Sequence, residues 1–212
     1  MQLICTGLSM YDQMRIISGI YRGRRIPFNN SEFGNARVTS DFVKEAVFGS
    51  LGPDLGGRNL LDLFAGSGQI GYEAISRGAT VWMNERDRKR SAFIESMVTK
   101  WSLTEQTTLT TEDAWKLIDR LAESEPCPAF DLVYIDPPYD ASTTAGKPLS
   151  LACLETLATS PLLSSTVTVF VQHDQRTDLP TDVGNLSIGR SKRYSGSKLS
   201  TYCWSVDLIS SV

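Results

Sequence analysis

The feature that most constrains the fold of this chain is a glycine-rich segment, Asp62-Leu-Phe-Ala-Gly-Ser-Gly-Gln-Ile-Gly71. It follows an apolar run, 59–61, that is typical of a strand, and it precedes a segment, 72–77, that is typical of a helix. Glycines at such a turn let the backbone adopt positive φ and approach a ligand closely, and the first amides of the helix offer hydrogen-bond donors. The pattern predicts a nucleotide-cofactor turn, but it fits a dinucleotide as well as S-adenosylmethionine.

A second motif is expected to act together with this turn. Its sequence is Phe130-Asp-Leu-Val-Tyr-Ile-Asp136-Pro137-Pro138-Tyr139. Its apolar residues predict a buried strand, which must stop at Asp136 because two successive prolines cannot continue the hydrogen-bond ladder. The Asp136 carboxylate is therefore expected at the carboxyl end of a strand. In an open parallel sheet, ligands bind at this edge, so the two motifs are expected to form one site.

Strand and helix patterns alternate along the rest of the chain. Strands are expected at 60–64, 80–84, 107–111, 130–135 and 166–172, helices at 70–77, 88–101, 114–121 and 149–158, and a final hairpin at 186–194 and 199–208. This alternation predicts an α/β fold with a Rossmann-like, doubly wound, mostly parallel sheet that closes with a C-terminal antiparallel hairpin.

The N-terminal part is expected to form a small appendage. Residues 15–28 mix β-branched and aromatic residues with glycines and predict a short hairpin with arginines on one face. A helix capped at 39–41 is expected to run to about Leu51. We therefore divide the chain into an appendage, residues 1–52, and a main domain, residues 53–212.

Composition excludes several classes of protein. With 41% apolar and 21% charged residues among 212, the chain resembles an ordinary globular domain, and no segment approaches the ~20 apolar residues that cross a bilayer. Residues 1–8 lack the features of a signal peptide, so a cytoplasmic protein is expected. The four cysteines are far apart and His173 is the single histidine, so we expect neither a metal site nor a disulfide framework.

Basic residues concentrate near both ends of the chain, although the net charge is −3. Residues 1–37 carry five arginines against two acids, and residues 184–200 carry four basic residues and no acid. Such clusters are typical of phosphate contacts with a nucleic acid, if they meet in space. The residues in question are Arg15, Arg22, Arg24, Arg25, Arg37, Arg190, Lys192, Arg193 and Lys198.

Three acids indicate how an adenosine-type cofactor would be held. Glu85 follows a predicted strand, 19 positions after Gly66, where Rossmann-type folds place an acceptor for ribose hydroxyls. Asp113 is placed either to meet an adenine amino group or to cap the next helix. Asp62 lies four residues before the first glycine, where it suits the ammonium group of a methionine moiety, so it favours S-adenosylmethionine over a dinucleotide.

The proline-rich motif fits the chemistry of methyl transfer to an amine. An exocyclic amine on a base is a poor nucleophile, because its lone pair is delocalised into the ring. Acceptors for its N–H groups return electron density to nitrogen and stabilise the positive charge that develops. Asp136 offers a carboxylate, the carbonyl next to Pro137 offers a second acceptor, and the Tyr139 ring offers a stacking surface.

With these residues, the chain resembles the amino-group class of class I S-adenosylmethionine-dependent methyltransferases. Its segments 15–26 and 37–48 resemble more narrowly the RsmD family, which methylates N2 of a guanine in small-subunit 16S ribosomal RNA. Val38, Gln172 and the turn Tyr194-Ser-Gly-Ser depart from the family pattern. The resemblance implies a monomeric enzyme that acts on ribosomal RNA or a 30S assembly particle.

The resemblance also implies residue roles. The target amine would be held by Asp136, Pro137, Pro138 and Tyr139. The RNA would contact Arg15, Arg22, Arg24, Arg25, Arg37, Lys192 and Arg193. The cofactor would be bound by Asp62, Phe64, Ala65, Gly66, Ser67, Gly68, Glu85, Arg86, Asp113 and Ala114.

Three alternatives remain open from the residues. A DNA adenine-N6 methyltransferase, or another nucleic-acid amino-methyltransferase, would use the same amine motif, although no segment here is long enough for a large sequence-reading domain. A nicotinamide-dependent oxidoreductase would share the glycine-rich turn but leaves the proline-rich motif unexplained. A non-catalytic RNA-binding assembly protein would keep the fold without needing Asp136.

Overall fold

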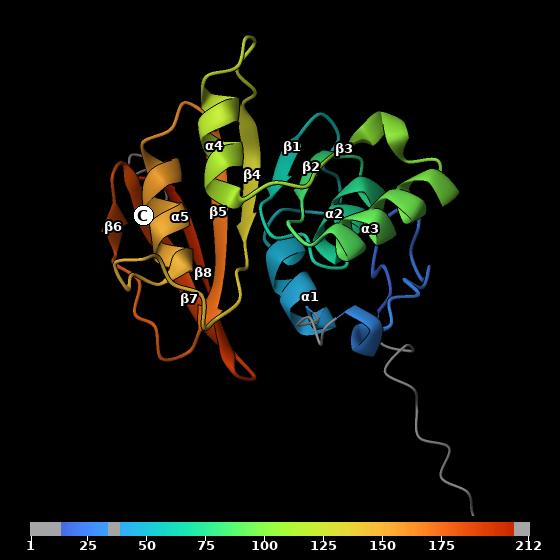
Figure 1. The fold of residues 1–212 in the computed structure, drawn as a ribbon, viewed down its shortest axis with the longest axis horizontal. Coiled ribbons are helices and arrows are strands. Elements are labelled where there is room, and N and C mark those ends of the chain that lie inside the picture. The colour runs from blue at the N-terminus through green and yellow to red at the C-terminus, as the bar shows by residue number, and fades with distance from the viewer. Residues whose placement is uncertain (1–13, 34–38, 206–212) are drawn as a thin grey trace, which may run out of the picture.

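An eight-stranded sheet runs through the molecule in the order β3-β2-β1-β4-β5-β8-β7-β6 (Figure 1). The computed structural model describes residues 14–33 and 39–205. Strands β1 to β5 are parallel, whereas β8 runs antiparallel to both β5 and β7. The strands are β1 (Asn59–Asp62), β2 (Thr80–Asn84), β3 (Thr107–Thr110), β4 (Phe130–Ile135), β5 (Leu163–Asp174), β6 (Asp182–Val183), β7 (Leu186–Tyr194) and β8 (Ser197–Trp204). The predicted fold class is confirmed.

Helices cover both faces of the sheet, and each face has its own apolar cluster. Helices α1, α2 and α3 pack with the N-terminal segment on one face, and α4 and α5 pack on the other (Figure 1). The helices are α1 (Asp41–Gly49), α2 (Gln69–Ser76), α3 (Arg88–Lys100), α4 (Ala114–Ala122) and α5 (Leu149–Ala158), with short 3-10 helices η2 (Asn30–Phe33) and η3 (Thr104–Gln106). Within the described residues, no helix is both long and apolar enough to span a membrane.

The structure differs from the predicted elements mainly at their ends. Strand β5 begins at Leu163 rather than at residue 166, because Leu163 pairs with Phe130 ahead of an irregularity in the ladder. The two-residue strand β6 and both 3-10 helices lack a periodic pattern and were not predicted. Strand β8 spans Ser197–Trp204 and is followed by a turn at Ser205, and residues 206–208 of the predicted continuation lie outside the described residues.

The strand order reverses at β1, and this reversal creates the binding edge. The chain proceeds outward from β1 through β2 to β3, and then returns to the other side of β1 to form β4 and β5. Asp62, the last residue of β1, pairs in register with Met83 on β2 and Tyr134 on β4. The loops that leave β1 and β4 therefore diverge toward opposite faces, which leaves a crevice between them.

The N-terminal segment is fastened to α2 by buried polar groups. The predicted hairpin at 15–28 is a turn with one isolated bridge, between Arg15 and Arg25. The Glu73 carboxylate accepts hydrogen bonds from the backbone amides of Ile17, at 2.8 Å, and Ser18, at 3.0 Å. Ser76 on the next turn of α2 accepts from the Tyr21 amide at 2.9 Å. Because these groups are hydrogen-bonded and buried, the turn has a fixed position on the main domain.

We predict that Gly19→Ala destabilises the protein more than Gly23→Ala. The two glycines are a matched pair, because they lie in one turn and have nearly the same φ, +82° and +81°. Alanine costs roughly 1–2 kcal/mol in this left-handed conformation at either position. At Gly19, however, a Cβ atom would lie 1.9 Å from the Ser76 carbonyl oxygen, whereas Gly23 has open space. Urea unfolding should show an additional loss of about 1–3 kcal/mol for Gly19→Ala. Equal losses would contradict the docking of this turn on α2.

Candidate active-site cleft

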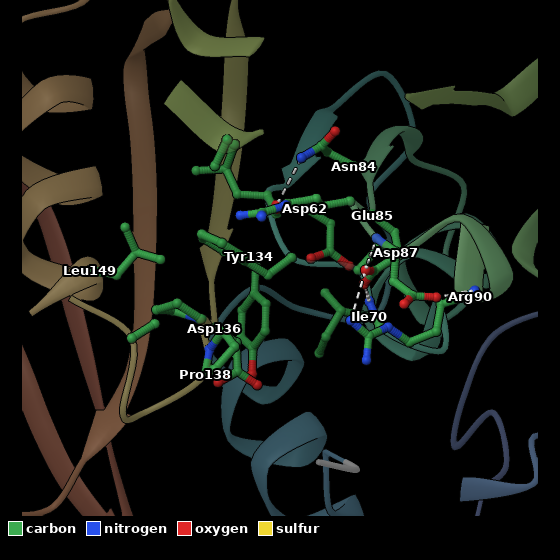
Figure 2. A pocket seen from close by; sticks show the side chains of 18 of the residues that line it. Asp62, Ile70, Asn84, Glu85, Asp87, Arg90, Tyr134, Asp136, Pro138 and Leu149 are labelled. Atoms are coloured by element: carbon green, nitrogen blue, oxygen red, sulfur yellow. Dashed lines mark hydrogen bonds and ion pairs between the residues drawn. The ribbon is translucent and has the colours of Figure 1, made fainter. Parts of the chain in front are cut away.

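A cleft of about 880 Å³ lies at the carboxyl ends of β1, β2, β3 and β4. In Figure 2, Tyr134 and Asp136 lie on one side, Glu85, Asp87 and Arg90 lie on the other, and Asp62 lies between them. The two sequence motifs thus contribute to one cleft. Of the residues that the sequence assigned to a cofactor or a target amine, those lining the cleft are Asp62, Phe64, Ala65, Gly66, Ser67, Glu85, Arg86, Asp113, Ala114, Asp136, Pro137, Pro138 and Tyr139.

Gly68 does not line the cleft but shapes the loop that does. It is the residue before α2, with φ +80°, and a Cβ atom there would lie 2.7 Å from the Tyr72 ring. Gly71 allows α2 to approach β2, because a Cβ atom at this position would lie 2.4 Å from the Met83 sulfur. The second and third glycines of the motif are therefore explained by close packing, while Gly66 faces the cleft.

Glu85 holds the glycine-rich loop in place. Its Oε2 accepts a hydrogen bond from the Gly66 amide at 2.8 Å, and its Oε1 accepts from the Asp87 amide at 2.8 Å. The Arg90 guanidinium forms an ion pair with Oε1 at 3.1 Å. Oε1 thus has two contacts, whereas Oε2 has one and keeps a further lone pair that can accept a hydrogen bond from a ligand hydroxyl. The predicted ribose contact of Glu85 stays a prediction.

Asp62 is a buried carboxyl group with no hydrogen-bond partner at either oxygen among the described residues, and its exposed fraction is 1%. Burial raises its pKa to about 7, and the negative charge of Glu85 contributes to the increase. The Phe64 amide lies near enough to oppose this shift, although it does not meet the geometry of a hydrogen bond. A buried carboxyl group without donors is costly unless a ligand supplies them. The site therefore fits a cationic donor such as an ammonium group.

Asp113 and Asn84 organise the far end of the cleft. Asp113 caps α4 by accepting from the Trp115 amide at 3.1 Å, and its other oxygen pairs with Arg86 at 3.4 Å. The Asn84 side chain donates to the carbonyls of Leu63 and Glu112 at 3.2 Å and also accepts from the Glu112 amide. Asn84 thus ties together the loops after β1 and β3. The sequence analysis missed it, although an amide side chain that ends a predicted strand is a recognisable signal.

The carboxyl group of Asp136 lies inside the cleft, although the residue as a whole keeps some exposure. Its Oδ1 is inaccessible to solvent, and burial raises the pKa of the carboxyl well above its ordinary value. Pro137 is buried and Pro138 is exposed, so the backbone turns outward directly after Asp136. The Tyr139 ring is half-buried and lines the same cleft. The loop therefore presents a carboxyl group, a proline-fixed backbone and an aromatic ring to one space.

Arginines and lysines of the two basic segments lie outside this cleft. Arg15, Arg22, Arg24, Arg25, Lys192 and Arg193 are exposed, and Arg37 lies outside the described residues. In Figure 1 the N-terminal segment lies on the right, beside α2 and α3, whereas the β7–β8 hairpin lies left of centre with its turn at the lower edge. Helix α1 lies between the two basic segments in this view. Arg176, Arg193 and Lys198 line a smaller depression of about 410 Å³ near the hairpin turn.

The cysteines and His173 do not gather at the cleft. Cys127 and Cys153 are free thiols, Cys203 lies on β8, and Cys5 lies outside the described residues. His173 is buried on β5 and contacts Ser200 Oγ at 2.9 Å. No group of three or more His, Cys, Asp or Glu side chains in the described part of the chain is arranged to hold a metal ion.

Comparisons with known proteins identify relatives over most of the chain. The model of a family described as "Conserved hypothetical protein 95" matches residues 14–203. The "Putative rRNA methyltransferase YlbH" of Bacillus subtilis is 32% identical, over 89% of this chain and 98% of that protein. The "Ribosomal RNA small subunit methyltransferase D" of Haemophilus influenzae is 36% identical, over 66% of this chain and 71% of that protein.

A solved structure extends this likeness to three dimensions. The structure titled "Putative methyltransferase yhhF from Escherichia coli" has a TM-score of 0.72 and 26% identity. The match covers 91% of this chain and 98% of that chain. The family model spans residues 14–203, which include the N-terminal segment and nearly all of the β7–β8 hairpin as well as the central sheet.

We predict that Asp62→Asn stabilises the ligand-free protein at neutral and alkaline pH. The wild-type folded state holds the Asp62 proton more tightly than the unfolded state does, so it loses stability as pH rises from about 4 to about 7. A pKa raised from 3.8 to about 7 corresponds to on the order of 4 kcal/mol above that range. Urea unfolding should give nearly equal stabilities near pH 3.5 and a more stable variant at pH 8. A variant that is less stable at pH 8 would show that Asp62 is satisfied within the protein.

Proposed function

The chain belongs to the Conserved hypothetical protein 95 family, and on this premise we propose that it transfers a methyl group to the exocyclic N2 amine of a guanine in small-subunit ribosomal RNA. The resemblance to the RsmD family in segments 15–26 and 37–48 is confirmed by relatives that carry the name "Ribosomal RNA small subunit methyltransferase D". The protein is an S-adenosylmethionine-dependent methyltransferase. That the substrate is RNA, and that the methylated atom is N2 of a guanine, is our proposal.

One observation carries this proposal: the unsatisfied carboxyl of Asp62 and the buried carboxyl of Asp136 line one cleft from adjacent strands. S-adenosylmethionine has an ammonium group, ribose hydroxyls and an adenine. Asp62 would bind the ammonium group, and Glu85 would accept from the ribose. The first amides of α2 and the polar residues near Asp113 lie at the same edge. A dinucleotide has no ammonium group for Asp62, so the residues fit S-adenosylmethionine better.

The cofactor supplies an electrophilic methyl group, and the residues around Asp136 prepare the nucleophile. The Asp136 carboxylate and the carbonyl next to Pro137 would accept hydrogen bonds from the amine, which stabilises the charge that develops on nitrogen. Burial strengthens these electrostatic contacts but also raises the pKa of Asp136. A bound amine supplies donors that favour the ionised form, so Asp136 becomes a carboxylate when substrate is present. The Tyr139 ring would stack on the base and hold it in line with the methyl group.

The exposed basic residues are proposed to contact the RNA backbone. Those of the N-terminal segment and those of the β7–β8 hairpin lie on two sides of the molecule, so an RNA that reaches both would pass across the open edge between them. Phosphate contacts at separate points fix the orientation of a nucleic acid without reading its sequence. We therefore propose residues 1–52 as the RNA-contact appendage and residues 53–212 as the methyltransferase domain. A structured ribosomal particle would present such a surface better than a regular duplex.

A methyl-transfer assay with tritiated S-adenosylmethionine tests the proposal. The acceptors are 30S particles that lack the modification, naked ribosomal RNA and duplex DNA. We predict label in ribosomal RNA that is recovered as N2-methylguanine. Asp136→Ala should lower kcat by roughly 10²- to 10³-fold, because it removes an acceptor that acts in the transition state. Asp119→Ala, an exposed aspartate on α4, is the matched control and should retain full activity.

Other outcomes of this assay point to other functions. Label in DNA would assign the protein to the adenine or cytosine amino-methyltransferases. Full activity of Asp136→Ala on RNA would show that Asp136 has no role in the reaction. Cofactor binding without label in any acceptor would contradict the proposed substrate class.

We also predict that cofactor binding releases a proton near pH 6. The Asp62 carboxyl is mostly protonated there, since burial raises its pKa to about 7, and an ammonium group next to it lowers that pKa again. Calorimetry of S-adenosylmethionine binding in buffers with different ionisation enthalpies measures the release, which should approach one proton and disappear in Asp62→Asn. Equal release from the variant and the wild type would show that the ammonium group does not bind at Asp62.

A further inference from the structure

We infer that Gln172 is a positioning residue that fixes the Tyr139 ring and joins the amine-acceptor loop to the basic β7–β8 hairpin. The inference rests on the proposed function, because the ring is significant only if a base binds against it. Gln172 lies near the carboxyl end of β5 and is buried, with an exposed fraction of 4%. It does not line the cleft, so it acts through its neighbours.

The Gln172 amide uses all of its hydrogen-bonding directions except one lone pair. Its Oε1 accepts a hydrogen bond from the Tyr134 hydroxyl. Its Nε2 donates one hydrogen to the Tyr139 hydroxyl at 3.3 Å and the other to Ser197 Oγ at 3.4 Å. All three partners are hydroxyl groups, which can donate or accept, so both ends of the buried Gln172 amide are satisfied. A buried polar network in which every member is satisfied is rigid.

The three partners come from three different parts of the site. Tyr134 is the buried β4 residue two positions before Asp136, and it lines the cleft. Tyr139 belongs to the loop after β4, and its ring is half-buried at the cleft. Ser197 is the first residue of β8, directly after the hairpin turn and next to the paired residues Arg193 and Lys198. One side chain thus connects the strand below the acceptor carboxyl, the stacking ring and the basic hairpin.

This connection has a specific consequence for catalysis. The Tyr139 ring is attached to a loop that contains two prolines, and Gln172 contacts the hydroxyl end of the ring from the buried side. Misplacement of a reacting group by about 1 Å can lower a rate by about 10²-fold. Loss of the Gln172 contact should therefore lower kcat, because orientation in the transition state depends on it. It should leave KM for RNA nearly unchanged, because the variant keeps the Tyr139 ring and all the charged side chains that would contact phosphates.

A double-mutant cycle tests whether Gln172 acts through the Tyr139 hydroxyl. The variants are Gln172→Met, which keeps the size of the side chain, Tyr139→Phe, which keeps the ring, and the pair together. We expect each single variant to lower kcat about 10-fold with KM for RNA within about twofold, and the pair to lower kcat little further. Gln106→Met is the matched control, because Gln106 is exposed at the amino end of β3, away from the cleft, and should behave as wild type.

The outcomes separate a positioning role from a structural one. The inference would be overturned if the kcat loss of the double variant equals the product of the two single losses. An unchanged kcat in Gln172→Met would also overturn it. If Gln172→Met fails to fold, Tyr139→Phe alone decides, because it removes the same hydrogen bond and leaves Gln172 in place. An unchanged kcat in Tyr139→Phe would then overturn the inference.

A second readout does not depend on methyl transfer. In protein with ¹³C-labelled tyrosine rings, the Tyr139 resonance is assigned by its absence in Tyr139→Phe. We expect it to shift or broaden in Gln172→Met and to stay in place in Gln106→Met. An unmoved resonance would overturn the inference even if the enzyme is active. If wild-type protein methylates no RNA, the proposed function fails, and this spectrum still decides whether Gln172 fixes the ring.

Discussion

The site depends on the reversal of strand order at β1. Because β2 and β4 flank β1 and the chain turns to opposite faces after β1 and β4, the loops at this edge cannot close over one another. The crevice between them is the cleft, and its two walls are the two motifs that stand about seventy positions apart in the sequence. The helices on both faces and the paired register of Asp62 with Tyr134 keep this spacing fixed.

Polar groups buried at the edge divide into two kinds. Glu85 and Asn84 are satisfied by the protein itself and hold the loops after β1 and β3. Asp62 has no such partners in the described part of the chain, and burial raises the pKa of both Asp62 and Asp136. Folding therefore leaves the stabilisation of the Asp62 carboxyl group to a ligand. This is the pattern expected of a binding site, where stability is reduced so that a ligand contributes the missing interaction.

Much of the fold was predictable from the sequence, because its elements have strong local signals. The β2 bounds were predicted as found, and the predicted helices 88–101 and 114–121 differ from α3 and α4 by one residue at the C-terminal end. Strand β6 has two residues and no pattern to detect. The separation of the two basic segments was also beyond sequence reasoning, because it depends on where α2 and β5 place them in space.

The site residues also divide into those with a local sequence signal and those whose contacts depend on the tertiary structure. The glycines and the double proline have local causes, so their place at the cleft edge could be inferred from backbone chemistry. Gln172 could be noticed only as a departure from a family pattern. Its three hydrogen bonds reach residues that lie 33 and 38 positions before it and 25 positions after it, and no local sequence pattern indicates such contacts. The docking of Ile17 and Ser18 on Glu73 is likewise long-range and needs the tertiary structure.

The most direct test of this account is a crystal structure of the protein with S-adenosylhomocysteine. The account predicts that the amino group of this molecule lies within hydrogen-bond distance of the Asp62 carboxylate, that its ribose lies near Glu85, and that its sulfur faces the Asp136 side of the cleft. An amino group bound elsewhere, with Asp62 still lacking a donor, would contradict the central claim that this buried carboxyl group is the anchor of the cofactor.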